Sequence, residues 1–359
     1  MNESSDLKER PILVTGGAGF IGSCFVRRQL RRGAACVVVL DKLTYAGSPD
    51  NLAEFRDHPN VVFVQGDVAD LELVGRLLRE HAIGVVVHLA AETHVDRSID
   101  DPWPFVGTNV LGTCRLLEAT RRYWDGLSED QKQRFRFVHV STDEVFGALA
   151  GLEGAFDEQS PYRPSSPYAA SKAAADHFVL AYGRTFGLPV IVTHCTNNYG
   201  PYQFPEKLIP LMILRALRGE RLPVYGRGEQ RRDWLFVEDH CWGLELAAAR
   251  GVPGERYLFG SGCDRTNLEV VHAVCDAVDR LAEQLPHRPT RSLIEFVPDR
   301  PGHDFRYALD TQRTCRQLGW KPRTEFHQGI EATVRWYLEH PEWVAAVRRR
   351  YDLRRLGLG

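Results

Sequence analysis

The chain has 359 residues, which is enough for a large hydrophobic core and for two lobes. Its 45 basic and 47 acidic residues nearly balance, and this excludes a global field that would favour nucleic acid or a membrane surface as a partner. The eight cysteines are nowhere closer than twelve residues apart and the histidines show no metal-ligand spacing, so we predict no bound metal and no redox pair. The N-terminus is polar and no apolar run reaches the length of a membrane span, so we expect a cytoplasmic protein.

Apolar, β-branched runs alternate with amphipathic stretches through the first half of the chain. Helical patterns follow the first run as far as about Arg32 and extend over Leu71–His81, Phe105–Tyr123 and Tyr168–Phe186. Strand–helix alternation of this length predicts an α/β fold with a doubly wound, mostly parallel sheet of the Rossmann type. The predicted strands are Pro11–Thr15, Ala35–Leu40, Val61–Gln65, Val85–Leu89, Phe135–Ser141 and Pro189–Thr193.

The second half of the chain breaks this rhythm. Prolines interrupt it between shorter helical patterns, at positions 201, 205, 210, 223, 253, 286, 289, 298 and 301. That composition is typical of a lobe of loops and helices, and we expect it over the carboxyl edge of the sheet. We therefore predict a Rossmann domain over residues 10–195, with a return of the chain around 230–262, and a smaller, mixed, ligand-binding lobe mainly over 196–359.

A glycine-rich segment, Thr15–Gly22, follows the first predicted strand and opens the first helix. Gly16, Gly19 and Gly22 permit a tight turn and let backbone N–H groups approach a pyrophosphate at the helix N-terminus. Asp41 ends the second strand, nineteen residues after Gly22, where a carboxylate can hold an adenosine ribose and repel a 2′-phosphate. This context favours an NAD site over a glycine-rich turn without a ligand.

Two later turns can complete the NAD site. Asp67, after the third strand, can accept a hydrogen bond from the adenine amine, and Ala90 and Ala91, after the fourth strand, leave room for a cofactor to pass. Without the glycine loop, ordinary turn chemistry and tight packing would explain both features equally well.

Two adjacent acids, Asp143 and Glu144, follow the fifth strand, and a Tyr168-x-x-x-Lys172 pair comes after them. Tyr and Lys at this spacing share a helix face, so the ammonium can lower the pKa of the phenol, and a phenolate beside a nicotinamide can take the proton of an alcohol. Two neighbouring carboxyl groups in a closed cleft cannot both ionise cheaply, so we expect one to keep its proton. One acid and one base are what the loss of water requires. The alternative is that the two acids cap a turn and pair with arginine.

With these motifs the chain resembles the extended short-chain dehydrogenases/reductases and, within them, the nucleotide-sugar 4,6-dehydratases, most closely those that act on dTDP-glucose. The discriminating element is Thr142-Asp143-Glu144, because the epimerases of this superfamily lack the acidic pair. Phe146 departs from the family pattern, which has a tyrosine at this place. The matching segments are Thr15–Gly22, Asp41–Asn51, Ala90–Ile99, Ser141–Gly147, Ser165–His177, Asn197–Leu211, Tyr225–His240 and Pro298–Asp304.

The resemblance implies a redox-neutral reaction on a tightly bound NAD that is recycled in each turnover. Tyr168, helped by Thr142 and Lys172, would take the proton of the 4-hydroxyl of dTDP-glucose while the C4 hydride passes to NAD. Glu144 would remove the C5 proton that the 4-ketone makes acidic, and Asp143 would protonate the leaving 6-hydroxyl. Return of the hydride to C6 would give dTDP-4-keto-6-deoxyglucose.

The same resemblance implies the residues that bind the two ligands. Those for NAD are Gly16, Gly19, Phe20, Ile21, Gly22, Asp41, Lys42, Leu43, Thr44, Asp67, Val68, Ala90, Ala91, Thr108, Tyr168, Lys172 and Asn198. Those for the nucleotide sugar are His94, Thr142, Asn197, Lys207, Leu208, Pro223, Tyr225, Arg232, Asn267, Arg300 and His303.

Residue chemistry alone leaves some of the substrate contacts open. Lys207 at a helix start and Arg232 with its forked guanidinium suit a diphosphate. A lone lysine is usually only solvated, however, and Arg232 can instead pair with Asp233 or Asp239. Tyr225 can stack on a nucleobase or lie in the core.

Other functions share this scaffold. A dehydratase for UDP- or CDP-glucose is the first alternative, and a nucleotide-sugar 4-epimerase or decarboxylase is less favoured because neither reaction expels a 6-hydroxyl, for which Asp143 is suited. A catalytically silent cofactor-binding protein would not need all five catalytic residues. Helices Phe105–Trp124 and Tyr168–Phe186 carry apolar residues on more than one face, so we expect a homodimer, although helices buried within one chain would have the same pattern.

Overall fold

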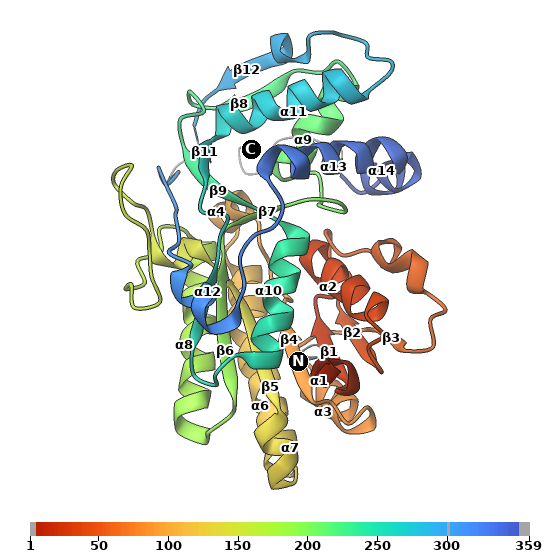
Figure 1. Cartoon of the computed structure of the whole chain (residues 1–359), viewed down its shortest axis with the longest axis vertical. Helices are drawn as coiled ribbons and strands as arrows, with labels where there is room; N and C mark the ends of the chain where they lie inside the picture. Colours follow the sequence, from red (N-terminus) through yellow and green to blue (C-terminus); the bar gives the residue numbers. More distant parts are fainter. Residues whose placement is uncertain (1–4, 300–301, 352–359) are drawn as a thin grey trace.

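The core of the protein is a parallel sheet whose strands run in the order β10-β6-β5-β4-β1-β2-β3 (Figure 1). The computed structural model describes residues 5–299 and 302–351. The six predicted strands are all present, joined by a seventh from the second half of the chain, and the predicted doubly wound α/β fold is confirmed. The strands are β1 Ile12–Thr15, β2 Val37–Asp41, β3 Val61–Gln65, β4 Val85–His88, β5 Arg136–Thr142, β6 Val190–Cys195 and β10 Arg256–Phe259.

Helices cover both faces of this sheet, which is why its strands are continuous apolar runs rather than alternating ones. Successive side chains of β1 pack on opposite faces of the sheet: Ile12 and Val14 belong to the buried cluster on one face, and Leu13 to the cluster on the other. The helices are α2 Phe20–Arg31 and α10 Val237–Arg250 in the first layer, and α3 Leu71–Glu80, α6 Thr113–Asp125 and α8 Pro167–Phe186 in the second.

The helix predicted over Phe105–Tyr123 is interrupted. It consists of α5 (Trp103–Phe105), a π-helical turn η2 (Val106–Gly112) and then α6. Such wide turns occur frequently at functional sites. A π turn contains more residues than a turn of α-helix, and the apolar periodicity of the sequence does not show this difference. The sequence therefore predicted one regular helix.

A second group of elements, with its own apolar core, lies at one end of the parallel sheet (Figure 1). It contains a three-stranded sheet in the order β11-β9-β7 and a two-stranded sheet of β12 and β8. Its elements are β7 Asn197–Tyr199, α9 Leu208–Leu217, β8 Leu222–Tyr225, β9 Arg231–Phe236, β11 Asp264–Thr266, α11 Asn267–Leu281, β12 Ile294–Val297, α13 Phe326–Glu339 and α14 Pro341–Arg348.

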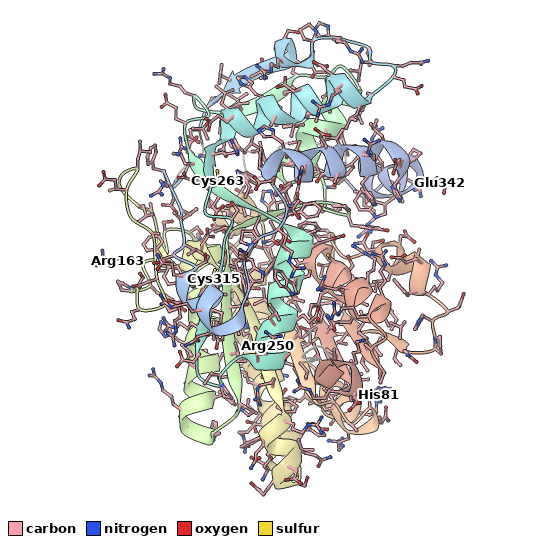
Figure 2. The ribbon with its side chains drawn as sticks, in the orientation of Figure 1. His81, Arg163, Arg250, Cys263, Cys315 and Glu342 are labelled. Atoms are coloured by element: carbon pink, nitrogen blue, oxygen red, sulfur yellow. The ribbon has the colours of Figure 1, made fainter. Side chains whose placement is uncertain are left out.

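The chain returns from this second group to the parallel sheet. β10 pairs with β6, and α12 (Gln312–Leu318) packs beside β10. Arg250, which Figure 2 shows at the end of α10, donates a hydrogen bond to the carbonyl of Leu318 (3.3 Å). The remaining short elements are α1 Ser5–Glu9, η1 Pro49–Phe55, α4 Val95–Asp100, α7 Glu129–Arg134, η3 Asp143–Phe146 and η4 Thr290–Leu293.

Over the described ranges, no helix combines the length and the apolar composition that a membrane crossing would need.

Candidate active site

A cavity of about 300 Å³ lies at the carboxyl ends of β1, β2, β4 and β5, the place where open α/β sheets bind their ligands. The glycine loop, the turns after β2, β3 and β4, the acidic pair after β5 and the start of α8 all contribute to its lining. The segment between β6 and α9 closes it from the other group of elements. The fold therefore brings the predicted NAD loop and the predicted proton-handling residues to one cavity.

The glycine loop is shaped so that a dinucleotide can approach its backbone. Gly16 has φ +69°, and a Cβ there would lie 2.7 Å from the backbone nitrogen of Ala90. A Cβ on Gly22 would lie 2.1 Å from the carbonyl oxygen of Gly16. α2 begins after Gly19 without a capping side chain, which leaves the N–H groups of its first turn to an anion such as a pyrophosphate.

Asp41 faces this loop from the end of β2. Its carboxylate accepts hydrogen bonds from the backbone N–H groups of Ala18 (2.9 Å) and Leu43 (2.8 Å). Burial raises the pKa of Asp41, and the two N–H donors oppose that rise. Leu43 was predicted to contact NAD, but it does not line the cavity; it has φ +56° and holds Asp41 through its backbone.

The turn after β3 carries an ion pair that the sequence did not predict. Lys42 donates from Nζ to Oδ2 of Asp67 (2.7 Å), and Oδ1 accepts from the N–H of Ala69 (2.9 Å). Burial alone would raise the pKa of Asp67, but Lys42 and the N–H of Ala69 hold it below its usual value. Lys42, Asp67 and Val68 all line the cavity.

Asp143 has the environment of a carboxylic acid that keeps its proton. It is 2% exposed; Oδ1 accepts from the hydroxyl of Thr142 (3.3 Å), and the buried Oδ2 has no hydrogen-bond partner within the described part of the chain. Burial, and after it the charge of Glu144, raises the pKa of Asp143 well above its usual value, although Arg232 opposes this. The turn is capped by Thr142, which accepts from the N–H of Glu144 (3.3 Å), so the acids are not needed as its caps.

Tyr168 and Lys172 lie one helical turn apart at the start of α8, and both are buried. Burial, then the negative charge of Glu144, raises the pKa of the Tyr168 phenol, and a hydrogen bond with Thr142 opposes this. Nζ of Lys172 donates to the carbonyl of Val140 at the end of β5 (2.9 Å). The expectation that the Lys172 ammonium lowers the pKa of Tyr168 stays a prediction, since this bond uses only one of its three N–H donors.

The first turn of α8 is fixed by side chains that the sequence did not single out. The N–H of Tyr168 donates to Ser98 Oγ (3.1 Å), and Asn109 Nδ2 donates to Ser171 Oγ (2.8 Å). Asn109, from the π turn, also bonds both backbone groups of Glu92. Through Asn109, the π turn η2 thus connects the turn after β4 to the start of α8. Thr108 of the same π turn lines the cavity, as do Ala90 and Ala91.

Phe146, which replaces the tyrosine of the family pattern, packs in a buried cluster beside the acidic pair. It is 1% exposed and stacks on Phe156 (centroids 5.3 Å apart), with Tyr162 and His194 also against it. The cluster around its ring is largely apolar.

Three predicted residues line the cavity from the segment between β6 and α9: Asn197, Asn198 and Lys207. Asn198 is oriented by His240, whose Nδ1 lies 3.0 Å from Oδ1, and Lys207 donates from Nζ to the carbonyl of Thr93 (2.9 Å).

Glu206, beside Lys207, was not predicted, although it lines the same cavity. It is buried, accepts a hydrogen bond from the hydroxyl of Tyr45 (3.0 Å) and pairs with Arg97 (3.6 Å). Burial raises the pKa of Glu206. Its position directly before a lysine at a helix start was the available signal.

Arg232 does not line this cavity. It is 5% exposed, donates to the carbonyls of Asp304 (2.9 Å) and Phe305 (3.4 Å), and stacks 4.4 Å over the ring of Tyr307. Its guanidinium nevertheless lies close enough to Asp143 to influence that carboxyl group.

The remaining predicted substrate residues that the structure describes are not among those lining the cavity. His94 caps α4 by accepting from the N–H of Arg97 (3.4 Å), and Tyr225 donates to Asp96 (3.1 Å) while it lies edge-on to His303. Arg300 lies outside the described residues. The others begin or belong to elements of the second group: Leu208 in α9, Pro223 in β8 and Asn267 in α11.

Comparison with known proteins identifies the family. The family model described as GDP-mannose 4,6 dehydratase matches residues 13–333. The chain is 53% identical over 346 residues to a dTDP-glucose 4,6-dehydratase of Xanthomonas campestris pv. campestris (96% of this chain, 98% of that protein) and 50% identical over 345 residues to one of Escherichia coli K12 (94% and 95%). The crystal structure of DesIV, a dTDP-glucose 4,6-dehydratase from Streptomyces venezuelae with NAD bound, matches with a TM-score of 0.85 at 45% identity (94% and 99%). The chain belongs to the GDP-mannose 4,6 dehydratase family, within the nucleotide-sugar 4,6-dehydratases.

Proposed function

We propose that this chain is an NAD-dependent dTDP-glucose 4,6-dehydratase, which converts dTDP-glucose to dTDP-4-keto-6-deoxyglucose and water. The observation that carries this proposal is the environment of Asp143. A buried carboxyl group with a raised pKa and an orphaned Oδ2 beside Glu144 and Tyr168 suits the donation of a proton to a leaving hydroxyl.

The residues at the glycine loop fit NAD. Gly16 and Gly22 allow a backbone approach that a Cβ would block, and the carboxylate of Asp41 suits a ribose diol rather than a 2′-phosphate. When bound, NAD supplies a hydride acceptor for the sugar C4 and a hydride donor for C6. Its positive charge would also favour the phenolate form of Tyr168.

The proton transfers are assigned to four side chains of the cavity. Tyr168, hydrogen-bonded with Thr142, takes the proton of the 4-hydroxyl. Glu144 removes the proton from C5 once C4 is a ketone, and Asp143 gives its proton to the 6-hydroxyl, which leaves as water. Glu144 then returns a proton to C5 when C6 accepts hydride. Burial raises the pKa of Asp143 and so favours the protonated form from which it can donate.

A 4-epimerase or decarboxylase on this scaffold would have no use for Asp143. Neither reaction expels a hydroxyl group, and a buried carboxyl without a second hydrogen-bond partner is costly to keep. The observation favours a dehydratase over both.

The nucleobase is tested by incubation with dTDP-, UDP-, CDP- and GDP-glucose and assay of the 4-keto product. We expect dTDP-glucose to give the highest kcat/KM, with no net formation of NADH. A 4-epimer as the product, or a preference for another nucleotide, would contradict the proposal.

Retention of NAD should depend on Arg350, near the end of the described chain. Its Nη2 donates to the carbonyls of Tyr45 (2.8 Å) and Gly47 (2.6 Å), in the loop that follows Asp41. We expect Arg350→Ala to release NAD about tenfold faster, which corresponds to the loss of about 1.4 kcal/mol. Bound NAD is measured after gel filtration and acid release. Arg349→Ala, at an exposed neighbouring arginine, is the matched control; equal NAD loss from both variants would refute the role of Arg350.

We also propose a homodimer built on the η2, α6 and α8 surface. Val106, Leu111, Phe178 and Phe186 are each more than two-fifths exposed there, although they are large and apolar. Sedimentation velocity should show Phe178→Asp as a monomer. Phe296→Asp, at an exposed phenylalanine of β12, should remain dimeric. A wild-type monomer at micromolar concentration would contradict the proposal.

The division into a Rossmann domain over 10–195 and a nucleotide-sugar lobe over 196–359, with the return around 230–262, remains a prediction. So do the cytoplasmic location and the absence of a nucleic-acid partner.

A further inference from the structure

Asp176 is a completely buried carboxylate that none of the proton transfers uses. It accepts hydrogen bonds from four side chains that belong to three other segments. The donors are His139 Nε2 (3.0 Å) and Ser141 Oγ (2.8 Å) of β5, His194 Nε2 (3.0 Å) of β6, and the hydroxyl of Tyr162 (3.0 Å) in the loop before α8. One side chain of α8 thus holds β5 and β6 together.

This cluster carries a negative charge in the core of the protein. Burial alone would raise the pKa of Asp176, but the hydrogen bonds of His139 and His194 hold it far below its usual value. Burial lowers the pKa of His139 to about 4, so that imidazole is neutral and donates from Nε2. The carboxylate therefore remains ionised next to a neutral ring.

Lys172 lies one helical turn before Asp176 on α8 and is 4% exposed. Burial lowers the pKa of its ammonium, and the charge of Asp176 opposes this. Burial raises the pKa values of Cys195 and Tyr168, so both are neutral at physiological pH, and it lowers that of His88. The titratable groups around the ammonium are Tyr168 and Asp176 of α8, Cys195 of β6, His139 of β5 and His88 of β4. Asp176 is the anion among them.

We propose that Asp176 is a positioning residue for the reaction: it is the buried counter-ion that keeps Lys172 charged, and it fixes the ends of β5 and β6 against α8. The inference rests on the proposed function. Ser141, which donates to Asp176, directly precedes Thr142, so the same carboxylate holds the strand end that presents the acidic pair. Lys172 in turn donates to Val140, one residue earlier on that strand.

The charge of Lys172 can be followed without substrate, because the chain contains six lysines. Protein labelled with [ε-13C]lysine is titrated by NMR, and the Lys172 signal is assigned by its loss in Lys172→Met. In Asp176→Asn, we expect the titration midpoint of Lys172 to fall by about one pH unit or more. The alkaline limb of kcat should move to lower pH by the same amount, with KM for the nucleotide sugar unchanged.

Tyr162→Phe is the matched control. The substitution removes one hydrogen bond to Oδ2 of Asp176 but leaves that carboxylate charged, so the titration midpoint of Lys172 should stay at its wild-type value. An unchanged midpoint in Asp176→Asn, or an equal fall in Tyr162→Phe, would overturn the proposal. Because the titration needs no turnover, it tests the effect of Asp176 on Lys172 even if dTDP-glucose is not the substrate.

A double variant covers the case in which Asp176→Asn does not fold. Removing one of two opposite buried charges leaves the other uncompensated, whereas removing both does not. We therefore expect Asp176→Asn combined with Lys172→Met to recover a folded protein with a cooperative thermal transition. A double variant as unfolded as Asp176→Asn would contradict the counter-ion role.

Discussion

Tyr168→Phe should stop the reaction at its first step. The variant lacks the only oxygen of that side chain and cannot take the proton of the 4-hydroxyl, so kcat should fall by about 10²- to 10⁴-fold, the usual contribution of a general base. Mixed rapidly with dTDP-glucose, the variant should show no transient absorbance of NADH at 340 nm. Wild-type protein should show it.

The fold of Tyr168→Phe should survive, because the ring keeps its place against Phe105 (centroids 6.3 Å apart) and the backbone N–H keeps its bond to Ser98. NAD content and thermal transition therefore serve as controls. Normal turnover in a variant with intact NAD content would reject Tyr168 as the base.

Glu144→Gln should separate oxidation from the loss of water. Without a base at C5, elimination should slow by about 10²- to 10⁴-fold, while the first hydride transfer remains possible. The assay follows the incorporation of solvent deuterium at C5 by mass spectrometry. NAD reduction on a rapid time scale, measured in the same variant, shows that substrate still binds and is oxidised.

Asp143→Asn provides the comparison with Glu144→Gln. The amide keeps the size of the side chain but cannot protonate the 6-hydroxyl, so deuterium should still enter at C5 although no water is lost. Exchange at the wild-type rate in Glu144→Gln, or exchange lost in both variants alike, would refute the division between base and acid.

The parts of the fold that local sequence patterns encode were predictable. The six predicted strands are short runs rich in apolar residues, because strands of a parallel sheet are largely buried on both faces. The glycine loop was predictable because Gly16 and Gly22 occupy places where any side chain would collide with backbone. The acidic pair was predictable for a similar reason, since β5 delivers Asp143 directly to the sheet edge.

Features that depend on contacts between distant segments were not predictable. The direction of the Lys172 ammonium is set by the carbonyl of Val140 on a neighbouring strand, and spacing along α8 carries no information about it. Arg232 is held by carbonyls some seventy residues later in the chain, so its guanidinium lies outside the cavity. Asn109 and Asp176 are polar residues within helices, and only the assembled fold shows what they bind.

In the proposed reaction, one turnover oxidises C4, expels the 6-hydroxyl and reduces C6 with the same hydride. Incubation of the protein with dTDP-glucose deuterated at C4, followed by mass spectrometry and NMR of the product, tests this most directly. We expect a 4-keto-6-deoxy sugar with deuterium at C6 and a solvent-derived hydrogen at C5. Deuterium retained at C4 of a hexose that still carries its 6-hydroxyl would contradict it.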